Sequence, residues 1–204
     1  MLNQEKAFSD IIKEILRSRS PRMIPDEDSL FRHAAVLIPL FIKGNASHVL
    51  LTKRTNRVEE HKGQISFPGG HVEDGDSSPR ETALREAYEE VGIQREDVHV
   101  LGRADDAGTL SSNFIVHPFV GFISYPYPFR INAQEVRHII EVPLRVFTQG
   151  SPEDHLGDVE YGGRTYHGIV YPCDGGVIWG ATARIMENLV QILGNNLNLP
   201  GDGE

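Results

Sequence analysis

The sequence predicts an α/β domain in which helices cover both faces of a mixed β-sheet, an α/β/α sandwich. Strand-like and helix-like segments alternate along the whole chain, which favours layers of sheet and helix over a helical bundle or a pure barrel. The chain has 204 residues, 39% of them hydrophobic, which is enough for one ordinary domain with a substantial core. No internal repeat and no clear linker divides it.

Charge and cysteine content exclude several classes of protein. The chain has 20 Lys and Arg against 29 Asp and Glu, and this net charge of −9 gives it no electrostatic reason to bind nucleic acid or anionic membranes. The single cysteine, Cys173, excludes an internal disulfide framework and a zinc site built on cysteines. No apolar run approaches the roughly 20 residues that cross a bilayer, and the charged N-terminal segment does not resemble a secretory leader. We therefore expect a cytoplasmic protein.

Residues 1–30 are expected to form an amphipathic helix and a polar connector. The helix is predicted by apolar residues at helical spacing, namely Phe8, Ile11, Ile12, Ile15 and Leu16. The main domain is expected over residues 31–194. It begins with a buried strand over 34–42, a turn at Gly44-Asn45 and a hairpin partner over 48–52.

The next segments complete the predicted sandwich. A short strand over 64–67 ends at Pro68, and a helix over 78–91 is indicated by Ser77 or Ser78 as N-cap, Pro79 in its first turn and Gly92 at its end. Beyond it, strands are predicted over 98–102, 116–124 and 169–179, and helices over 135–140 and 181–193. The tail, 195–204, is expected to be disordered.

The predicted helix over 78–91 carries an unusual group of acids. Leu84, Ala87, Tyr88 and Val91 form an apolar stripe, and Glu86, Glu89 and Glu90 form a second stripe on nearly the opposite side. Carboxylates at this spacing lie within about 6 Å of each other and repel. A hard divalent cation relieves that repulsion and gains oxygen ligands, which indicates a Mg²⁺ or Mn²⁺ site. The alternative is a solvated surface face with Arg85 as the neighbouring counter-charge.

A glycine-rich segment before the helix favours the metal site. Phe67-Pro68-Gly69-Gly70 ends a strand, and proline before two glycines predicts a tight turn whose exposed backbone can approach a metal or a phosphate closely. In phosphoryl chemistry the protein mainly positions the substrate while a metal neutralises developing charge. The segment and the acidic helix together therefore indicate such a site.

The stretch GHVEDGDSSPRETALREAYEEVGI, residues 70–93, resembles the signature of the Nudix hydrolases. The match over residues 85–93 is complete apart from the small Ala87 at the apolar position. The spacer from Gly70 to Arg85 is one residue longer than the common form, and Asp76 is the nearest substitute for its usual glutamate. The resemblance implies the Nudix fold and hydrolysis of a diphosphate linked to another moiety.

A second stretch, LLTKRTNRVEEHKGQISFPGG over residues 50–70, is similar to the element that marks the coenzyme A pyrophosphatase branch of the Nudix superfamily. Thr55 replaces the usual serine of that element. The resemblance extends over about residues 34–193. It implies hydrolysis of coenzyme A, in free, oxidised or acylated form, to 3′,5′-ADP and 4′-phosphopantetheine or its derivative.

The resemblance also implies roles for residues of the acidic helix. It makes Glu86, Glu89 and Glu90 the metal-binding carboxylates and the carbonyl of Gly69 a main-chain ligand. Glu89 or Glu86 is the helix-borne candidate for the base that activates water. Arg85 is expected to orient neighbouring carboxylates in the catalytic site.

Other candidates lie outside that helix. Glu135, at the start of the predicted helix over 135–140, is a candidate extra ligand or base, or else a glutamate that the helix dipole favours at that position. Substrate binding is expected from Gly70 and from a basic cluster that suits an anionic ligand, with Arg54, Arg57 and Lys62 as its candidates beside Lys53.

Two alternatives remain open from the sequence. The same chemistry could act on nucleotide-sugars, dinucleotides or nucleoside triphosphates, or the chain could be a Nudix-fold binding module without activity. Intact Glu86, Glu89 and Glu90 argue against the second alternative. A homodimer is also possible, since the N-terminal helix could pack on a partner subunit.

Overall fold

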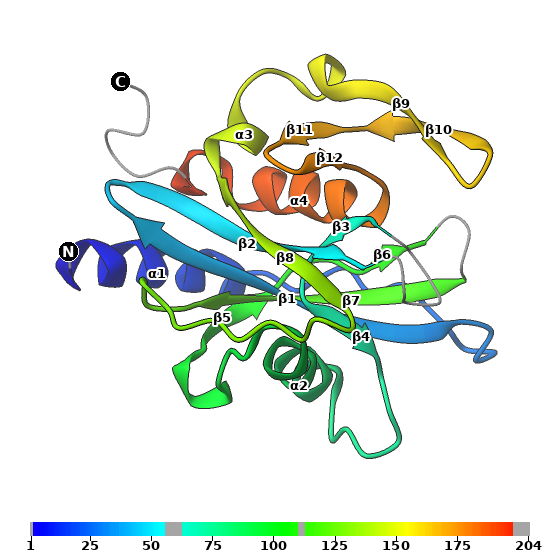
Figure 1. Ribbon diagram of the computed structural model, residues 1–204. Coiled ribbons are helices and arrows are strands. Elements are labelled where there is room, and N and C mark those ends of the chain that lie inside the picture. The colour runs from blue at the N-terminus through cyan, green and yellow to red at the C-terminus, as the bar shows by residue number, and fades with distance from the viewer. Residues whose placement is uncertain (1, 56–62, 110–112, 198–204) are drawn as a thin grey trace.

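The computed structural model describes residues 2–55, 63–109 and 113–197 and shows a sheet between two layers of helix (Figure 1). The helical elements are α1 (Leu2–Arg17), α2 (Pro79–Val91), η1 (Arg95–Asp97), α3 (Arg145–Thr148), η2 (Pro152–His155), α4 (Gly180–Leu193) and η3 (Gly194–Leu197). The strands of the main sheet are β1 (Arg32–Lys43), β2 (Ala46–Arg54), β3 (Ile65–Ser66), β4 (Gly69–His71), β5 (His99–Arg103), β6 (Ala107–Gly108), β7 (Phe114–Phe122) and β8 (Val136–Pro143).

The main sheet is mixed, as predicted. Its central path runs β3-β2-β1-β7-β5, while β4 pairs with β1, β6 with β7 and β8 with β2. The β1–β7 pair is parallel and the other pairs are antiparallel. Because β1 and β7 are parallel, the chain crosses from one to the other through α2 and β5. Two separate hairpins, β9–β10 (Leu156–Tyr161 and Arg164–Ile169) and β11–β12 (Tyr171–Cys173 and Gly176–Ile178), lie above α4 in Figure 1.

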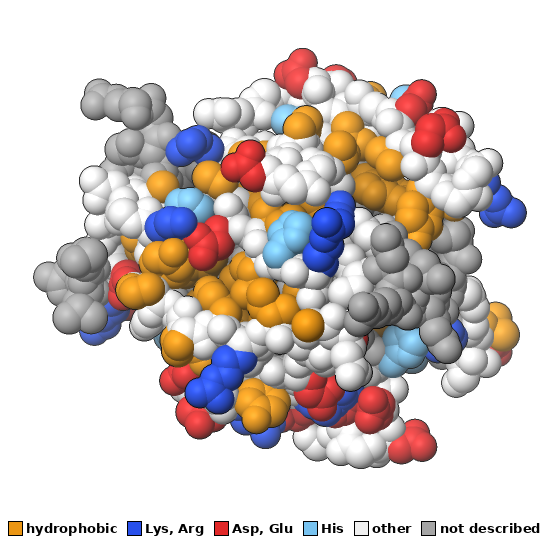
Figure 2. Space-filling model, viewed as in Figure 1, with side chains coloured by type: hydrophobic (Ala, Val, Ile, Leu, Met, Phe, Trp, Pro, Cys, Tyr) orange, Lys and Arg blue, Asp and Glu red, His pale blue; other side chains and the backbone are white. Residues whose placement is uncertain are grey.

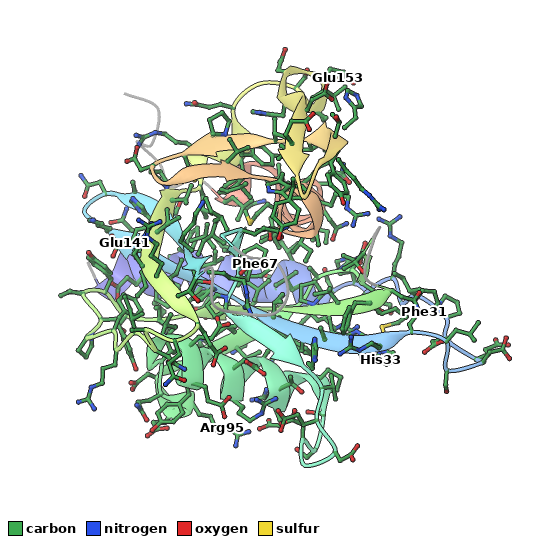
Figure 3. All side chains as sticks on the ribbon, turned by 45° about the vertical axis from the view of Figure 1, so that its right-hand side comes forward. Phe31, His33, Phe67, Arg95, Glu141 and Glu153 are labelled. Atoms are coloured by element: carbon green, nitrogen blue, oxygen red, sulfur yellow. The ribbon has the colours of Figure 1, made fainter. Side chains whose placement is uncertain are left out.

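Each face of the sheet has its own apolar core. On one face α2 packs on β1, with Ala35, Leu37 and Ala87 fully buried. On the other face α1 and α4 share a larger core that includes Ile12 and Leu189. Alternate residues of a strand point to opposite faces, so β1 contributes to both cores. In Figure 3, Phe67 lies between the sheet and α4, and its side chain is buried. This arrangement confirms the predicted α/β/α sandwich.

Several local predictions are confirmed. The N-terminal helix, the hairpin of β1 and β2 with Gly44 at a φ of 64°, α2, β5, β7 and α4 all occur close to where the sequence places them. The apolar side of α1 is buried within this chain: Phe8, Ile12 and Leu16 are at most 4% exposed. This side of the helix therefore belongs to the core of its own chain, and the homodimer stays a prediction.

Two predicted elements are wrong. Residues 136–143 form strand β8 along β2 instead of a helix, because Val136, Ile139, Ile140 and Val142 suit a pleated, half-buried surface better than a helix. The predicted strand over 169–179 is divided, since Gly175 and Gly176 turn the chain into the β11–β12 hairpin.

The predicted disorder of the tail is also wrong for its first residues. Residues 195–197 belong to η3, where Leu197 is fully buried and its carbonyl accepts a hydrogen bond from Ser47 Oγ at 2.6 Å. Residues 198–204 lie outside the described part of the chain. Within that part, none of the helices is long and apolar enough to span a membrane.

Candidate active site

Helix α2 is fixed at both ends and along one side. The Ser78 side chain accepts a hydrogen bond from the Glu81 N–H, and Gly92 ends the helix at a φ of 74°, in the left-handed region. Leu84, Ala87 and Val91 are buried as predicted. Tyr88 was expected in the same stripe but is 54% exposed.

The three glutamates of α2 lie in different environments. The side chain of Glu90 is 1% exposed, that of Glu86 13% and that of Glu89 49%. Glu90 thus lies at the junction between α2 and the sheet, where Arg54 Nη1 of β2 donates to its Oε1 at 3.1 Å. Along the predicted acidic stripe, burial therefore increases from Glu89, which faces solvent, through Glu86 to Glu90.

Arg85 holds the more exposed carboxylates. Its Nη1 donates to Glu86 Oε1 at 2.9 Å and to Glu89 Oε2 at 3.1 Å. Its Nε and Nη2 donate to the two oxygens of Asp76, each at 3.0 Å. This bidentate pairing holds the pKa of Asp76 well below its usual range. Arg85 therefore orients the carboxylates around it. Asp76, the nearest substitute in the sequence for the usual glutamate of the spacer, is its bidentate partner.

Gly69 and Gly70 form strand β4 instead of the predicted tight turn, since they pair with Val36 and Ala35 of β1. Neither glycine has a positive φ. The reason for glycine is close approach: a Cβ on Gly70 would collide with the Glu86 carboxylate, and one on Gly69 would collide with the backbone of β1. The absent side chains let Glu86 lie directly against the strand.

Glu135 reaches the same site from a turn, although no helix begins there. Its N–H donates to the Asn132 carbonyl at 3.1 Å, and its Oε1 accepts from Asn132 Nδ2 at 3.1 Å. Its charge raises the pKa values of both Glu86 and Glu90, so the three carboxylates lie close enough to repel one another. Sequence reasoning missed Asn132, whose only local signal is its position three residues before Glu135.

The electrostatics of this carboxylate group favour a cation. Burial raises the pKa of Glu90 to about 8, against the opposing effect of Arg54. Burial also raises the pKa of Glu86, although Arg85 opposes the shift. Within the described residues, Glu90 Oε2 is buried without a hydrogen-bond partner. An orphaned buried oxygen among repelling carboxylates fits a divalent ion. Within the described residues, however, no three acidic, histidine or cysteine side chains are arranged to hold one, and Arg85 and Arg54 bind oxygens of Glu86, Glu89 and Glu90.

Comparison with known proteins identifies this arrangement. The NUDIX domain family matches residues 31–146, more than half of the chain. The chain belongs to the Nudix family. A Yersinia enterocolitica protein named Uncharacterized Nudix hydrolase NudL is 40% identical over 159 residues, which cover 78% of this chain and 80% of that protein. A protein of the same name from Photorhabdus laumondii is 37% identical over 171 residues, or 84% of this chain and 88% of that one.

A solved structure agrees with the fold. The MutT/nudix family protein from Enterococcus faecalis superposes with a TM-score of 0.54 at 12% identity, over 87% of this chain and 71% of that chain. This likeness concerns the fold alone. As a Nudix hydrolase the protein acts on diphosphate bonds, and Nudix hydrolases generally use divalent ions such as Mg²⁺ or Mn²⁺.

Of the predicted substrate-binding residues of this Nudix hydrolase, the structure places two, Arg54 and Gly70, beside the acidic helix α2. Gly70 lies against Glu86, as described above, and Arg54 faces Glu90 at the same site. Lys53 Nζ points to the β11–β12 hairpin, where it donates to the Gly175 carbonyl at 3.2 Å. Arg57 and Lys62 lie outside the described residues.

Proposed function

We propose that this Nudix hydrolase cleaves the diphosphate of coenzyme A, or of its acyl or oxidised forms, to 3′,5′-ADP and 4′-phosphopantetheine or its derivative. One observation supports this most directly. The segment over 50–70, which resembles the coenzyme A pyrophosphatase element, touches the acidic helix at two points. Arg54 contacts Glu90, and Gly70 makes room for Glu86. The described parts of the segment that suggests the substrate, residues 50–55 and 63–70, therefore border the proposed active site.

We further propose that Glu86, Glu89, Glu90 and the Gly69 carbonyl hold Mg²⁺ or Mn²⁺. The donor set is all oxygen, as these ions prefer, and Glu90 Oε2 lacks a partner among the described residues. When bound, the ion supplies charge neutralisation for the diphosphate and a more acidic water.

The protein's own groups then position the reactants and move a proton. Arg85 fixes the orientation of the Glu86 and Glu89 carboxylates, and Asp76 fixes Arg85. Glu86, Glu89 and Glu135 are the candidates for the base that accepts the proton of the attacking water.

Product analysis tests the substrate. The protein is incubated with coenzyme A and Mg²⁺ or Mn²⁺, and the phosphate-containing products are separated and identified. We expect 3′,5′-ADP and 4′-phosphopantetheine in equal amounts. A parallel panel holds nucleotide-sugars, dinucleotides and nucleoside triphosphates. Turnover of a panel member with no turnover of coenzyme A would contradict the proposal while leaving the Nudix assignment intact.

A further inference from the structure

A cleft of about 350 Å³ runs along strand β8. It is lined by Phe129, His138, Ile139, Ile140, Glu141 and Asp174. Successive residues of a strand point to opposite faces, so a cleft lined by residues 138–141 in succession must follow the edge of the strand. Within the described chain, β8 pairs with β2 on one side and with no strand on the other. Unpaired backbone N–H and C=O groups of β8 therefore border this cleft.

The cleft begins beside the proposed active site. Glu135 directly precedes β8, and a strand rises about 3.3 Å per residue, so His138 lies roughly 10 Å from Glu135 along the backbone. Phe129 also lines the cleft, and its neighbour Arg130 donates its N–H to the carbonyl of Val91 at the end of α2. A group attached to a diphosphate at Glu86 and Glu90 can therefore extend into the cleft.

The lining chemistry suits an uncharged chain that contains amide groups. Phe129, Ile139 and Ile140 supply apolar surface, and Figure 2 shows hydrophobic side chains gathered on the face that β8 crosses. Glu141, labelled on β8 in Figure 3, and Asp174 are the lining carboxylates, and no lysine or arginine of the described part of the chain lines the cleft.

Two lysines nearby do not alter this balance. Lys43 pairs with Glu141 at 2.7 Å, and Lys53 donates to the Gly175 carbonyl beside Asp174. The cleft therefore offers no excess positive charge for a phosphate. Among the described residues the side chain of His138 makes no hydrogen bond, so its ring nitrogens are available to a ligand.

We propose that this cleft binds the pantetheine arm of the substrate, extended beside the free edge of β8. The arm is uncharged and carries two amide groups, which can pair with backbone N–H and C=O groups as an added strand does. The cleft begins at His138, roughly 10 Å along the backbone from Glu135 at the proposed active site, so an extended arm attached to the diphosphate can enter it. The 3′-phosphorylated nucleotide would then lie on the other side of the diphosphate. This inference rests on the proposed function, since it assigns a binding site to one half of coenzyme A.

A phosphate-free ligand tests the cleft independently of catalysis. Pantetheine is titrated into the ¹⁵N-labelled full chain, and the backbone amide shifts are followed by NMR. We expect the saturable shifts to concentrate in residues 138–141 and at Gly175. The double variant H138A/D174N is expected to weaken pantetheine binding at least about fivefold. The matched control, H167A/D158N, makes the same two changes at an exposed pair on β9–β10 and should bind as the original protein does.

Kinetics with coenzyme A supply the second readout. In H138A/D174N we expect KM for coenzyme A to rise about tenfold with kcat within about twofold, and inhibition by 3′,5′-ADP to be unchanged. Pantetheine shifts that fall elsewhere, or an unchanged KM in the double variant, would overturn the inference. Pantetheine binding at β8 without turnover of coenzyme A would instead contradict the proposed function, so the two failures are distinguishable.

Discussion

Two arginine–carboxylate clusters in this protein have opposite balances of charge. At the proposed active site, the single guanidinium of Arg85 serves Asp76, Glu86 and Glu89. On the other side of the molecule the single carboxylate of Asp105, 7% exposed, accepts hydrogen bonds from Arg19 and Arg22. The first cluster has more carboxylates than cations, and the second has more cations than carboxylates.

The difference distinguishes the cluster that we propose to be functional from a structural one. Asp105 also accepts from Asn188 of α4 at 3.1 Å, so this cluster ties the connector after α1 to the C-terminal helix. Its buried carboxylate is fully partnered, as a structural ion pair requires. The Arg85 cluster leaves negative charge in excess, and neighbouring Glu90 and Glu135 add to it. Excess buried charge costs folding stability and is best explained by a ligand that compensates for it.

Removing the buried charge of α2 should have the largest effect. We expect Glu90→Gln to lower turnover at least about 100-fold and to abolish thermal stabilisation by Mn²⁺, because a ligand carboxylate is lost. Folding should survive, since burial already raises the pKa of Glu90 to about 8 and an amide has the same shape. Activity assays and melting curves with and without Mn²⁺ check this. Glu14→Gln on the exposed side of α1 is the control, and retained turnover with retained Mn²⁺ stabilisation would refute the metal assignment.

Removing the charge of Asp105 should change stability without affecting catalysis. We expect Asp105→Asn to lower the free energy of unfolding by about 2–4 kcal/mol, because Arg19 and Arg22 lose their partner. Denaturant titration measures this change. Turnover at a temperature where the variant is folded should be unchanged, and Asp158→Asn, at an exposed ion pair, should alter stability little. A large loss of kcat in Asp105→Asn would show that the two clusters are coupled.

The pH dependence of the free energy of unfolding gives a second test of the Asp105 cluster. Burial opposes ionisation of Asp105, but Arg19, Arg22 and Asn188 outweigh it and lower its pKa below the ordinary 3.8. The folded state therefore binds fewer protons than the unfolded state in that range. The stabilisation is complete above the ordinary pKa and is lost as pH falls below it. Unfolding curves of Asp105→Asn should thus depend less on pH below about pH 4 than those of the original protein.

The sequence predicts one of these clusters and not the other. Arg85, Glu86 and Glu89 lie on one helix, so their proximity follows from helical geometry, and Asp76 lies nine residues before Arg85. Asp105 meets Arg22 and Asn188, each 83 residues away in sequence, and no local pattern indicates such a contact. Periodicity finds neighbours within an element, while contacts between elements depend on how the sheet assembles.

Glu135 shows a prediction whose local structure is wrong and whose role at the site stays a prediction. The sequence made it a candidate at the site and put it at the start of a helix. The structure brings it close to Glu86 and Glu90 from a turn before β8. The short stretch after it fits helix or strand by pattern alone, and pairing with β2 decides in favour of the strand. The burial of Glu90 was likewise invisible to sequence, because it depends on how α2 lies on the sheet.

Adding a methyl group at Gly70 should test whether the close approach of Glu86 to β4 matters for catalysis. We expect Gly70→Ala to lower kcat by about 10- to 100-fold, because the new Cβ would collide with the Glu86 carboxylate and displace it from Arg85. Gly168→Ala on β10, where no heavy atom lies within 4 Å of the added Cβ, is the matched control in a strand. Steady-state kinetics on both variants give the comparison. Equal kcat values would mean that the position of Glu86 is not critical.

The smallest effect is expected at Asp76, which acts through Arg85. Asp76→Asn keeps the size of the side chain but removes one charge-assisted pairing with the guanidinium, so Arg85 should hold Glu86 and Glu89 less firmly. We expect kcat to fall about tenfold with little change in KM, because Asp76 is proposed to act through Arg85 and not through contact with substrate. Asp76→Glu should recover part of the loss, whereas Asp74→Asn, two residues away and exposed, should have no effect. If Asp76→Asn raised KM and left kcat unchanged, Arg85 would have to contact substrate, and the excess of carboxylates around it would need another explanation.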